Sequence, residues 1–228
     1  MHKDLLTFAD SVPEMGCGGK IIKNHLMRFA EQIRPGNAVL DIAPFLGSTT
    51  TFLSCGLSNA NNKTSTIYSV DKWELEEKYR AWIKKRGLEI EDLQKEFYKN
   101  VSPFMEAGVK IVFYKQDIRS YYYNREPIQL LVDDIGISKD ITDHILKTCL
   151  PYFIPGQTII FFMDFYFFEE FKDYESRIYQ HDLMAANKGV FKFLERPKNS
   201  RTAIFKYLGG EINFIDDKKY YYDFKGAM

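Results

Sequence analysis

Short apolar runs alternate with longer amphipathic segments along most of the 228-residue chain. Five runs are apolar almost throughout and predict buried β-strands over residues 38–42, 66–70, 109–114, 128–132 and 158–163. Apolar residues at helical spacing predict helices over 21–33, 48–55 and 141–153, two charged helices within 73–104, and an aromatic helix from about residue 168. Strands that alternate with helices indicate a parallel sheet covered on both faces.

The two ends of the chain complete this arrangement. Residues 189–195 and 203–209 predict a closing antiparallel hairpin, whereas residues 1–18 predict irregular structure with a glycine-rich hinge. We therefore expect an α/β fold: a Rossmann-like, doubly wound, mostly parallel seven-stranded sheet with a C-terminal antiparallel hairpin. One domain spans 1–228, with a lead-in segment and helix over 1–36, a core over 37–208 and an aromatic tail over 209–228 that docks on the domain or on a second subunit.

Composition and charge limit the classes of partner and the cellular location that we expect for this protein. The 31 basic and 31 acidic residues give a formal net charge of zero, which disfavours a nucleic-acid partner. The three cysteines are widely spaced and predict reduced thiols in a cytoplasmic protein: Cys17, Cys55 and Cys149. The first 14 residues carry acids and do not read as a signal peptide. The most apolar segment, 151–168, is interrupted by proline, glycine and an acid, so no membrane span is expected.

Acidic residues stand at the end of every predicted parallel strand. They are Asp41, Asp71, Asp117 (preceded by Gln116), the pair Asp133 and Asp134, and Asp164. In a doubly wound sheet these strand ends border the crevice that binds ligands. A tight turn with Pro44 and Gly47 follows the first strand, and Ser48 and Thr49 begin the next helix. We interpret this edge of the sheet as a nucleoside-binding crevice.

The ordered motifs VLDIAPFLGSTTTFL, YSVDKW, KQD, LLVDD and PYFIPGQTIIFFMDF resemble class I S-adenosylmethionine-dependent methyltransferases. The likeness is greatest to a small bacterial branch that acts on sugars, antibiotics and glycans. The resemblance implies S-adenosylmethionine as cofactor and O-methylation of a sugar, glycan or small metabolite. Two residues depart from the family pattern: Ala43 replaces its first loop glycine, and Gly136 stands where many relatives carry histidine.

The resemblance also assigns roles in cofactor binding. Gly47 gives clearance for the cofactor, the Ser48 and Thr49 hydroxyls and the helix N-terminus donate to its carboxylate, and Asp71 accepts hydrogen bonds from both ribose hydroxyls. Lys72 and Trp73 line the adenine side, and an acid after the third strand receives the adenine amino group. The full expected set is Asp41, Ala43, Phe45, Gly47, Ser48, Thr49, Asp71, Lys72, Trp73, Gln116, Asp117 and Asp133.

Asp133, Asp134 and Asp164 are the expected catalytic residues, beside the transferred methyl group. Two mechanisms stay open: Asp133 or Asp134 is the general base for the acceptor hydroxyl, or Asp133 and Asp164 hold a Mg²⁺ ion that acidifies it. His144 is expected to be a helix-surface or core residue. The aromatic clusters at 121–123 and 165–168 are either platforms for the acceptor or part of the core or of a subunit interface.

Other functions fit the same pattern. The chain can be a methyltransferase-like pseudoenzyme or binding subunit that retains the fold without the chemistry, or a different small-molecule transferase that uses the same crevice. In every case the expected partner is a small molecule or glycan, with a homodimer formed through aromatic segments or the tail as a further expectation.

Overall fold

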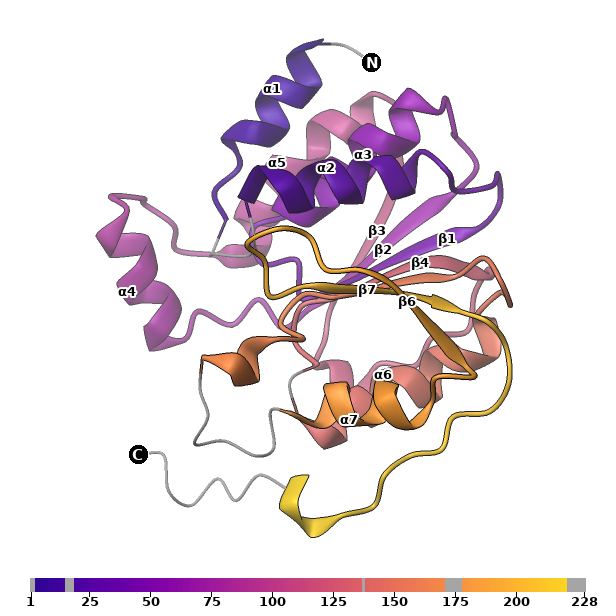
Figure 1. Cartoon of the computed structure of the whole chain (residues 1–228). Helices are drawn as coiled ribbons and strands as arrows, with labels where there is room; N and C mark the ends of the chain where they lie inside the picture. Colours follow the sequence, from indigo (N-terminus) through magenta and orange to yellow (C-terminus); the bar gives the residue numbers. More distant parts are fainter. Residues whose placement is uncertain (1–2, 15–18, 137, 171–177, 221–228) are drawn as a thin grey trace.

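The computed structural model describes residues 3–14, 19–136, 138–170 and 178–220 (Figure 1). Within them, seven strands form one sheet in the order β3-β2-β1-β4-β5-β7-β6. The strands are β1 (Ala38–Ile42), β2 (Thr66–Asp71), β3 (Lys110–Lys115), β4 (Ile128–Asp133), β5 (Ile159–Phe162), β6 (Phe191–Glu195) and β7 (Ala203–Tyr207). Strands β1 to β5 pair in parallel, and β7 runs antiparallel to both β5 and β6. The predicted fold class is confirmed.

Helices form a layer on each face of the sheet (Figure 1). One layer contains α1 (Lys3–Ser11), α2 (Gly19–Ala30), α3 (Ser48–Asn59) and α5 (Leu93–Glu106), and the other contains α6 (Lys139–Cys149) and α7 (Tyr179–Ala186). Helix α4 (Glu77–Lys85) projects beside the end of the sheet and belongs to neither layer. None of the helices within the described residues has the length and apolarity needed to cross a membrane.

Burial follows the position of each strand in the sheet. Every residue of β1 and β4 is buried, because both strands have neighbours on each side and helices on each face. Strand β3 is an edge strand, and Val112 within it is 38% exposed. The prediction that all five parallel strands are fully covered is therefore wrong for β3, which begins and ends with lysine and so carries the charges typical of a sheet edge.

Two expectations about helices are also wrong. Residues 3–11 form α1, which packs against α3 and α5, with the Phe8 and Phe104 rings 6.3 Å apart. The helix expected from about residue 168 begins at Tyr179, and a single 3₁₀ turn occupies Phe167–Glu169. The glycine-rich hinge falls mostly on residues 15–18, which lie outside the described residues.

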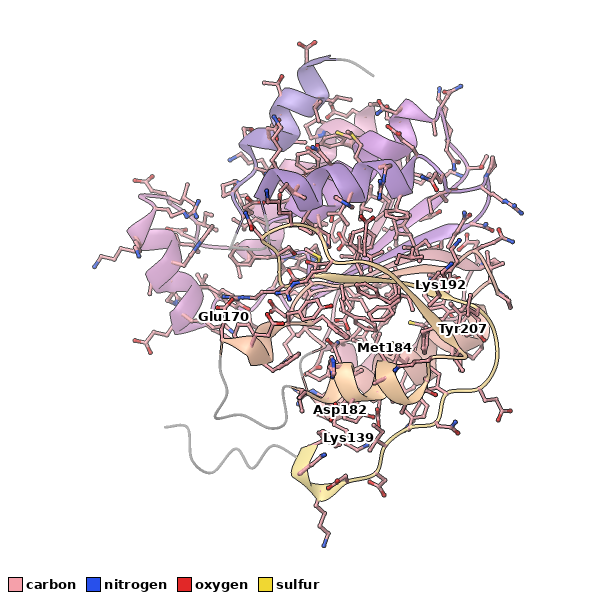
Figure 2. The ribbon with its side chains drawn as sticks, in the orientation of Figure 1. Lys139, Glu170, Asp182, Met184, Lys192 and Tyr207 are labelled. Carbon is pink, nitrogen blue, oxygen red and sulfur yellow. The ribbon has the colours of Figure 1, made fainter. Side chains whose placement is uncertain are left out.

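The C-terminal tail docks on its own domain over the described residues 209–220. The Asn213 amide donates to Asn187 Oδ1 at 2.8 Å. Tyr220 is buried, with its ring 5.0 Å from that of Tyr179 and its hydroxyl donating to Asp182 at 2.5 Å. Figure 2 shows Asp182 on α7, above this part of the tail. Docking on the domain is thus observed, while a subunit contact stays a prediction.

Candidate functional site

A cavity of about 590 Å³ lies where the parallel strands end, which is within the usual size range of ligand pockets. The ends of β1, β2, β4 and β5, the loop after β3, helix α2 and the segment leading into α4 all contribute to its wall. Ten residues of the predicted site line it: Ala43, Phe45, Ser48, Thr49, Asp71, Lys72, Gln116, Asp117, Asp134 and Asp164. Four of the predicted set are not among the lining residues: Asp41, Gly47, Trp73 and Asp133.

The loop between β1 and α3 has three residues in the left-handed region: Ala43 (φ 59°), Phe45 (φ 52°) and Gly47 (φ 91°). Ala43 therefore adopts the backbone conformation that a glycine at this position would favour. A Cβ at Gly47 would lie 3.0 Å from the Phe97 ring, so this glycine faces helix α5. In this structure Gly47 allows the turn to pack against α5, and the clearance it was expected to give a ligand stays a prediction.

Asp41 lies behind the cavity wall and is completely buried. Its Oδ2 accepts hydrogen bonds from the hydroxyls of Thr49 (2.9 Å) and Thr50 (2.6 Å), while Oδ1 has no hydrogen-bond partner within the described part of the chain. Burial raises the pKa of Asp41 from 3.8 to about 6. Because Thr49 lines the cavity, Asp41 orders the wall from beneath, and direct contact with a ligand is not what its position supports.

Asp71, the last residue of β2, presents its carboxylate to the cavity. Oδ1 accepts from the Trp73 amide at 2.7 Å and Oδ2 from the Phe45 amide at 3.0 Å. Burial raises the pKa of this carboxyl, and these amide donors oppose the rise. Each carboxylate oxygen has a second lone pair, so Asp71 is held in place and can still accept from a ligand.

Trp73 belongs to the core, which corrects its expected place beside a nucleobase. It is only 3% exposed, and its ring centroid lies 4.7 Å from that of Phe97 and 5.9 Å from that of Phe113. Its indole Nε1 donates to the Phe45 carbonyl at 2.8 Å. Trp73 therefore anchors the β1 loop to the aromatic cluster under α5.

The loop after β3 carries a charged network at one end of the cavity. Arg119 donates to Asp117 through Nε (3.1 Å) and Nη2 (2.7 Å), and the Lys72 ammonium lies 2.9 Å from Asp117 Oδ2. The Arg119 guanidinium holds the pKa of Asp117 below its usual range. Gln116 Nε2 donates to the Ser120 carbonyl at 2.7 Å. An adenine amino group would compete with these bonds, so the geometry favours Asp117 as the residue that orients Lys72 and Arg119.

Asp133 organises the turn between β4 and α6. Its Oδ1 accepts from the amides of Ile135 (3.1 Å) and Gly136 (2.8 Å), and Gln180 Nε2 lies 3.3 Å from Oδ2. A Cβ at Gly136 would lie 2.0 Å from that Oδ2, so a histidine cannot replace this glycine without moving Asp133. Burial raises the pKa of Asp133 to about 6. Asp133 thus shapes the turn and is not among the lining residues, whereas Asp134 lines the cavity; the direct roles expected for Asp133 stay predictions.

Comparison with solved structures gives matches over most of the chain. The O-methyltransferase NovP matches with a TM-score of 0.62 at 12% identity, covering 84% of this chain and 81% of its own. The TDP-rhamnose 3′-O-methyltransferase CalS11 gives 0.54 at 13% identity, covering 89% and 78%. The O-methyltransferase from Bacillus cereus, in complex with SAH, gives 0.53 at 16% identity, covering 91% and 90%. This chain has the fold of the class I methyltransferases. Comparisons with protein-family models and with curated proteins give no match.

Within this methyltransferase fold, the expected magnesium site is not supported. Over the described residues, no three or more histidine, cysteine, aspartate or glutamate side chains are grouped so that they could hold a metal ion. Asp133, one of the two expected ligands, already accepts bonds from two backbone amides and lies behind the wall. The donor set therefore does not fit Mg²⁺, which prefers several oxygen ligands in octahedral geometry.

The methyltransferase fold also brings residues into the cavity that the sequence motifs do not indicate. They come from the N-terminal region, the segment leading into α4, and the start of α6: Pro13, Glu14, Ile22, Lys23, Leu26, Glu74, Glu76, Lys78, Tyr79, Ser138, Asp140 and Ile141. Most are charged or apolar residues of amphipathic segments, and in the sequence they look like ordinary helix faces.

The aromatic clusters and the histidine belong to the protein interior or its helix surface. Tyr121, Tyr123 and Phe165 are buried, and none of the three lines the cavity. The core alternative is thus the one observed for them. His144 Nε2 lies 2.9 Å from the Tyr121 carbonyl oxygen, which fits the expected structural role. Cys55 and Cys149 are buried free thiols, as expected, and Cys17 lies outside the described residues.

Proposed function

We propose that this protein is an S-adenosylmethionine-dependent methyltransferase that methylates an oxygen of a sugar, glycan or small metabolite. The observation that carries the proposal is Asp71: a carboxylate fixed by two backbone amides at the tip of β2, facing a ligand-sized cavity. The fold shared with the O-methyltransferase NovP and with CalS11, a TDP-rhamnose 3′-O-methyltransferase of calicheamicin biosynthesis, supports the same reaction class.

The residues that line the cavity fit the chemistry of S-adenosylmethionine. Asp71 can accept from both ribose hydroxyls, and charge-assisted hydrogen bonds of this kind contribute about 1.5–3 kcal/mol each. Helix α3 begins after Gly47 without a side-chain cap, so the amides of its first turn can donate to a ligand carboxylate. S-adenosylmethionine, when bound, supplies a methyl group that its sulfonium already activates.

The chain's own contribution to the chemistry is to orient the acceptor and remove its proton. Asp134 and Asp164 follow β4 and β5 and are the two predicted catalytic carboxylates that line the cavity. Asp164 lies 3.9 Å from the Arg201 guanidinium. We assign one of them as the general base, since such a group needs only to reach the hydroxyl proton. Asp134→Asn and Asp164→Asn, assayed separately, identify which one.

Calorimetry with S-adenosylmethionine and S-adenosylhomocysteine (SAH) tests the proposal. We expect Asp71→Asn to weaken binding of both about ten- to a hundredfold, because it loses charge-assisted acceptance from the ribose. Glu74→Gln is a matched control, since Glu74 lines the same cavity and is exposed. Binding by the wild type that Asp71→Asn leaves unchanged would refute the ribose assignment.

Transfer itself is tested with methyl-labelled donor and a panel of sugar nucleotides, glycosides, small phenols and total RNA. Label in a sugar or metabolite pool is the expected result. Label in RNA would overturn the expected exclusion of nucleic acid. Donor binding without transfer to any pool would support the alternative of a binding subunit that retains the fold.

A further inference from the structure

One charged pair in the cavity has no part in the roles assigned so far. Lys23 of α2 is 9% exposed and lines the cavity together with Glu14, which follows α1. Its ammonium lies 3.3 Å from Glu14 Oε2 and 5.0 Å from the centre of the Phe52 ring. Lysine is almost never buried without a partner, and Glu14 supplies that partner here; because both members of the pair line the cavity, they present one positive and one negative group to a ligand.

The position of Lys23 along the cavity follows from Phe52. Phe52 and Ser48 are four residues apart on α3 and therefore share one face of the helix. The Lys23 ammonium thus lies against the side of α3 that also carries Ser48, and Lys23, Ser48 and Thr49 line the same cavity. Asp71 ends β2, Lys72 follows it, and Asp117 lies in the loop after β3, so these three cavity residues come from a different part of the chain.

We propose that Glu14 and Lys23 form the subsite for the α-amino acid end of the methyl donor, an inference that rests on the proposed function. A zwitterion presents one carboxylate and one ammonium on the same carbon. Lys23 is placed to donate to the carboxylate, and Glu14 to accept from the ammonium. Each protein charge then keeps an opposite charge beside it when the ligand enters, which limits the cost of desolvating the pair.

This assignment gives the cavity two electrostatically different ends. Asp71 binds the nucleoside end of the ligand through its neutral ribose hydroxyls. The amino acid end is bound by a cation, Lys23, and an anion, Glu14. Removal of Lys23 should therefore affect only ligands that carry the carboxylate. Removal of Glu14 should affect ligands that carry the ammonium. Neither change should matter for a ligand that ends at the thioether.

Three ligands separate these contributions in calorimetric titrations of the full chain. SAH carries both charged groups, its decarboxylated analogue carries only the ammonium, and 5′-methylthioadenosine carries neither. We expect Lys23→Met to weaken SAH binding roughly ten- to a hundredfold and to leave the other two within twofold. We expect Glu14→Gln to weaken SAH and its decarboxylated analogue, and to leave methylthioadenosine unchanged. Lys23→Arg, which keeps the charge, should restore most of the SAH affinity.

The control is Lys20→Met, which removes an exposed lysine of the same helix that does not line the cavity. Retained methylthioadenosine binding shows that each variant is folded. Equal loss of all three ligands in Lys23→Met, or SAH affinity unchanged from wild type, overturns the subsite and leaves the donor assignment standing. Wild-type protein that binds none of the three ligands overturns the proposed function, and this inference with it.

Discussion

Substitution of Asp41 by asparagine should make the stability of this protein depend less steeply on pH. Asp41 is fully buried, one carboxylate oxygen has no partner within the described residues, and burial raises its pKa from 3.8 to about 6. Between these two values the folded state holds a proton that the unfolded state has released. The contribution of Asp41 is therefore fully present below about pH 4 and is lost as the pH rises through 6.

The size of the effect follows from the shift. The rise in the pKa of Asp41 from 3.8 to about 6 corresponds to about 3 kcal/mol once both states are ionised. Roughly 1.4 kcal/mol of this develops between pH 5 and pH 8. Asparagine keeps a carbonyl that can accept from the Thr49 and Thr50 hydroxyls, and any cost of its new amide group does not change with pH. The gap between variant and wild type should thus move by about 1–2 kcal/mol in favour of Asp41→Asn from pH 5 to pH 8.

Urea unfolding followed by circular dichroism at pH 5, 6.5 and 8 measures this gap. Asp117→Asn is the control for the direction of the pH effect. The Arg119 guanidinium holds the pKa of Asp117 below its usual range, so this carboxyl is ionised in both states from pH 5 to 8 and its gap to wild type should stay constant. If the Asp41→Asn gap is the same at all three pH values, the carboxylate is not destabilised by burial and the reasoning fails.

Three further changes test the packing around the site. Gly136→Ala should lower the free energy of unfolding by at least about 2 kcal/mol, because its Cβ would lie 2.0 Å from Asp133 Oδ2; an unchanged urea midpoint would contradict this. Gly47→Ala should cost about 1–3 kcal/mol from the left-handed backbone and the 3.0 Å approach to the Phe97 ring, read from the same titration. Tyr220→Ala should cost about 3 kcal/mol and expose the tail to protease, and resistance equal to wild type would show that the tail is held elsewhere.

The sheet could be predicted from the sequence because its strands obey one simple pattern. A run such as 128–132 is apolar at every position except Gln129, and a strand buried on both faces favours such a run. Strand β3 shows where the pattern misleads. Its run from 109 to 114 is as apolar as the others, yet it forms the edge of the sheet, with Val112 partly exposed. Apolar content does not distinguish such an edge strand from a central one, because aromatic residues still cover one of its faces. The rings of Phe113 in β3 and Tyr98 in α5 lie 6.1 Å apart.

The N-terminal wall of the cavity could not be predicted for a different reason. Helix α1 is nine residues long, and its signal is weak because an isolated helix of that length is unstable on its own. It forms because its apolar side packs on α3 and α5, which are distant in sequence. Glu14 follows α1 and Lys23 lies on α2, which itself packs on α3, and both residues line the cavity. Charged residues on a short amphipathic helix carry no mark in the sequence that separates a ligand contact from a solvated surface.

The expected homodimer and cytoplasmic location stay predictions.

Asp71 is paired with Lys115 at the end of β2 and still lines the cavity, but the acids at the ends of β1, β4 and β5 divide by where each stands relative to the last paired residue. Asp41 pairs within β1 and Asp133 ends β4 in register with Ile42, and both are buried behind the wall. Asp134 and Asp164 come after the last strand residue, where the chain leaves the sheet, and both line the cavity. An acid inside the ladder is desolvated by the helices on either face and must be satisfied by local hydroxyls or amides, so it orders a loop. An acid beyond the ladder keeps its access to a ligand. The two positions of one sequence motif, Asp133 and Asp134, thereby acquire different functions: the first builds the turn, and the second is available for chemistry.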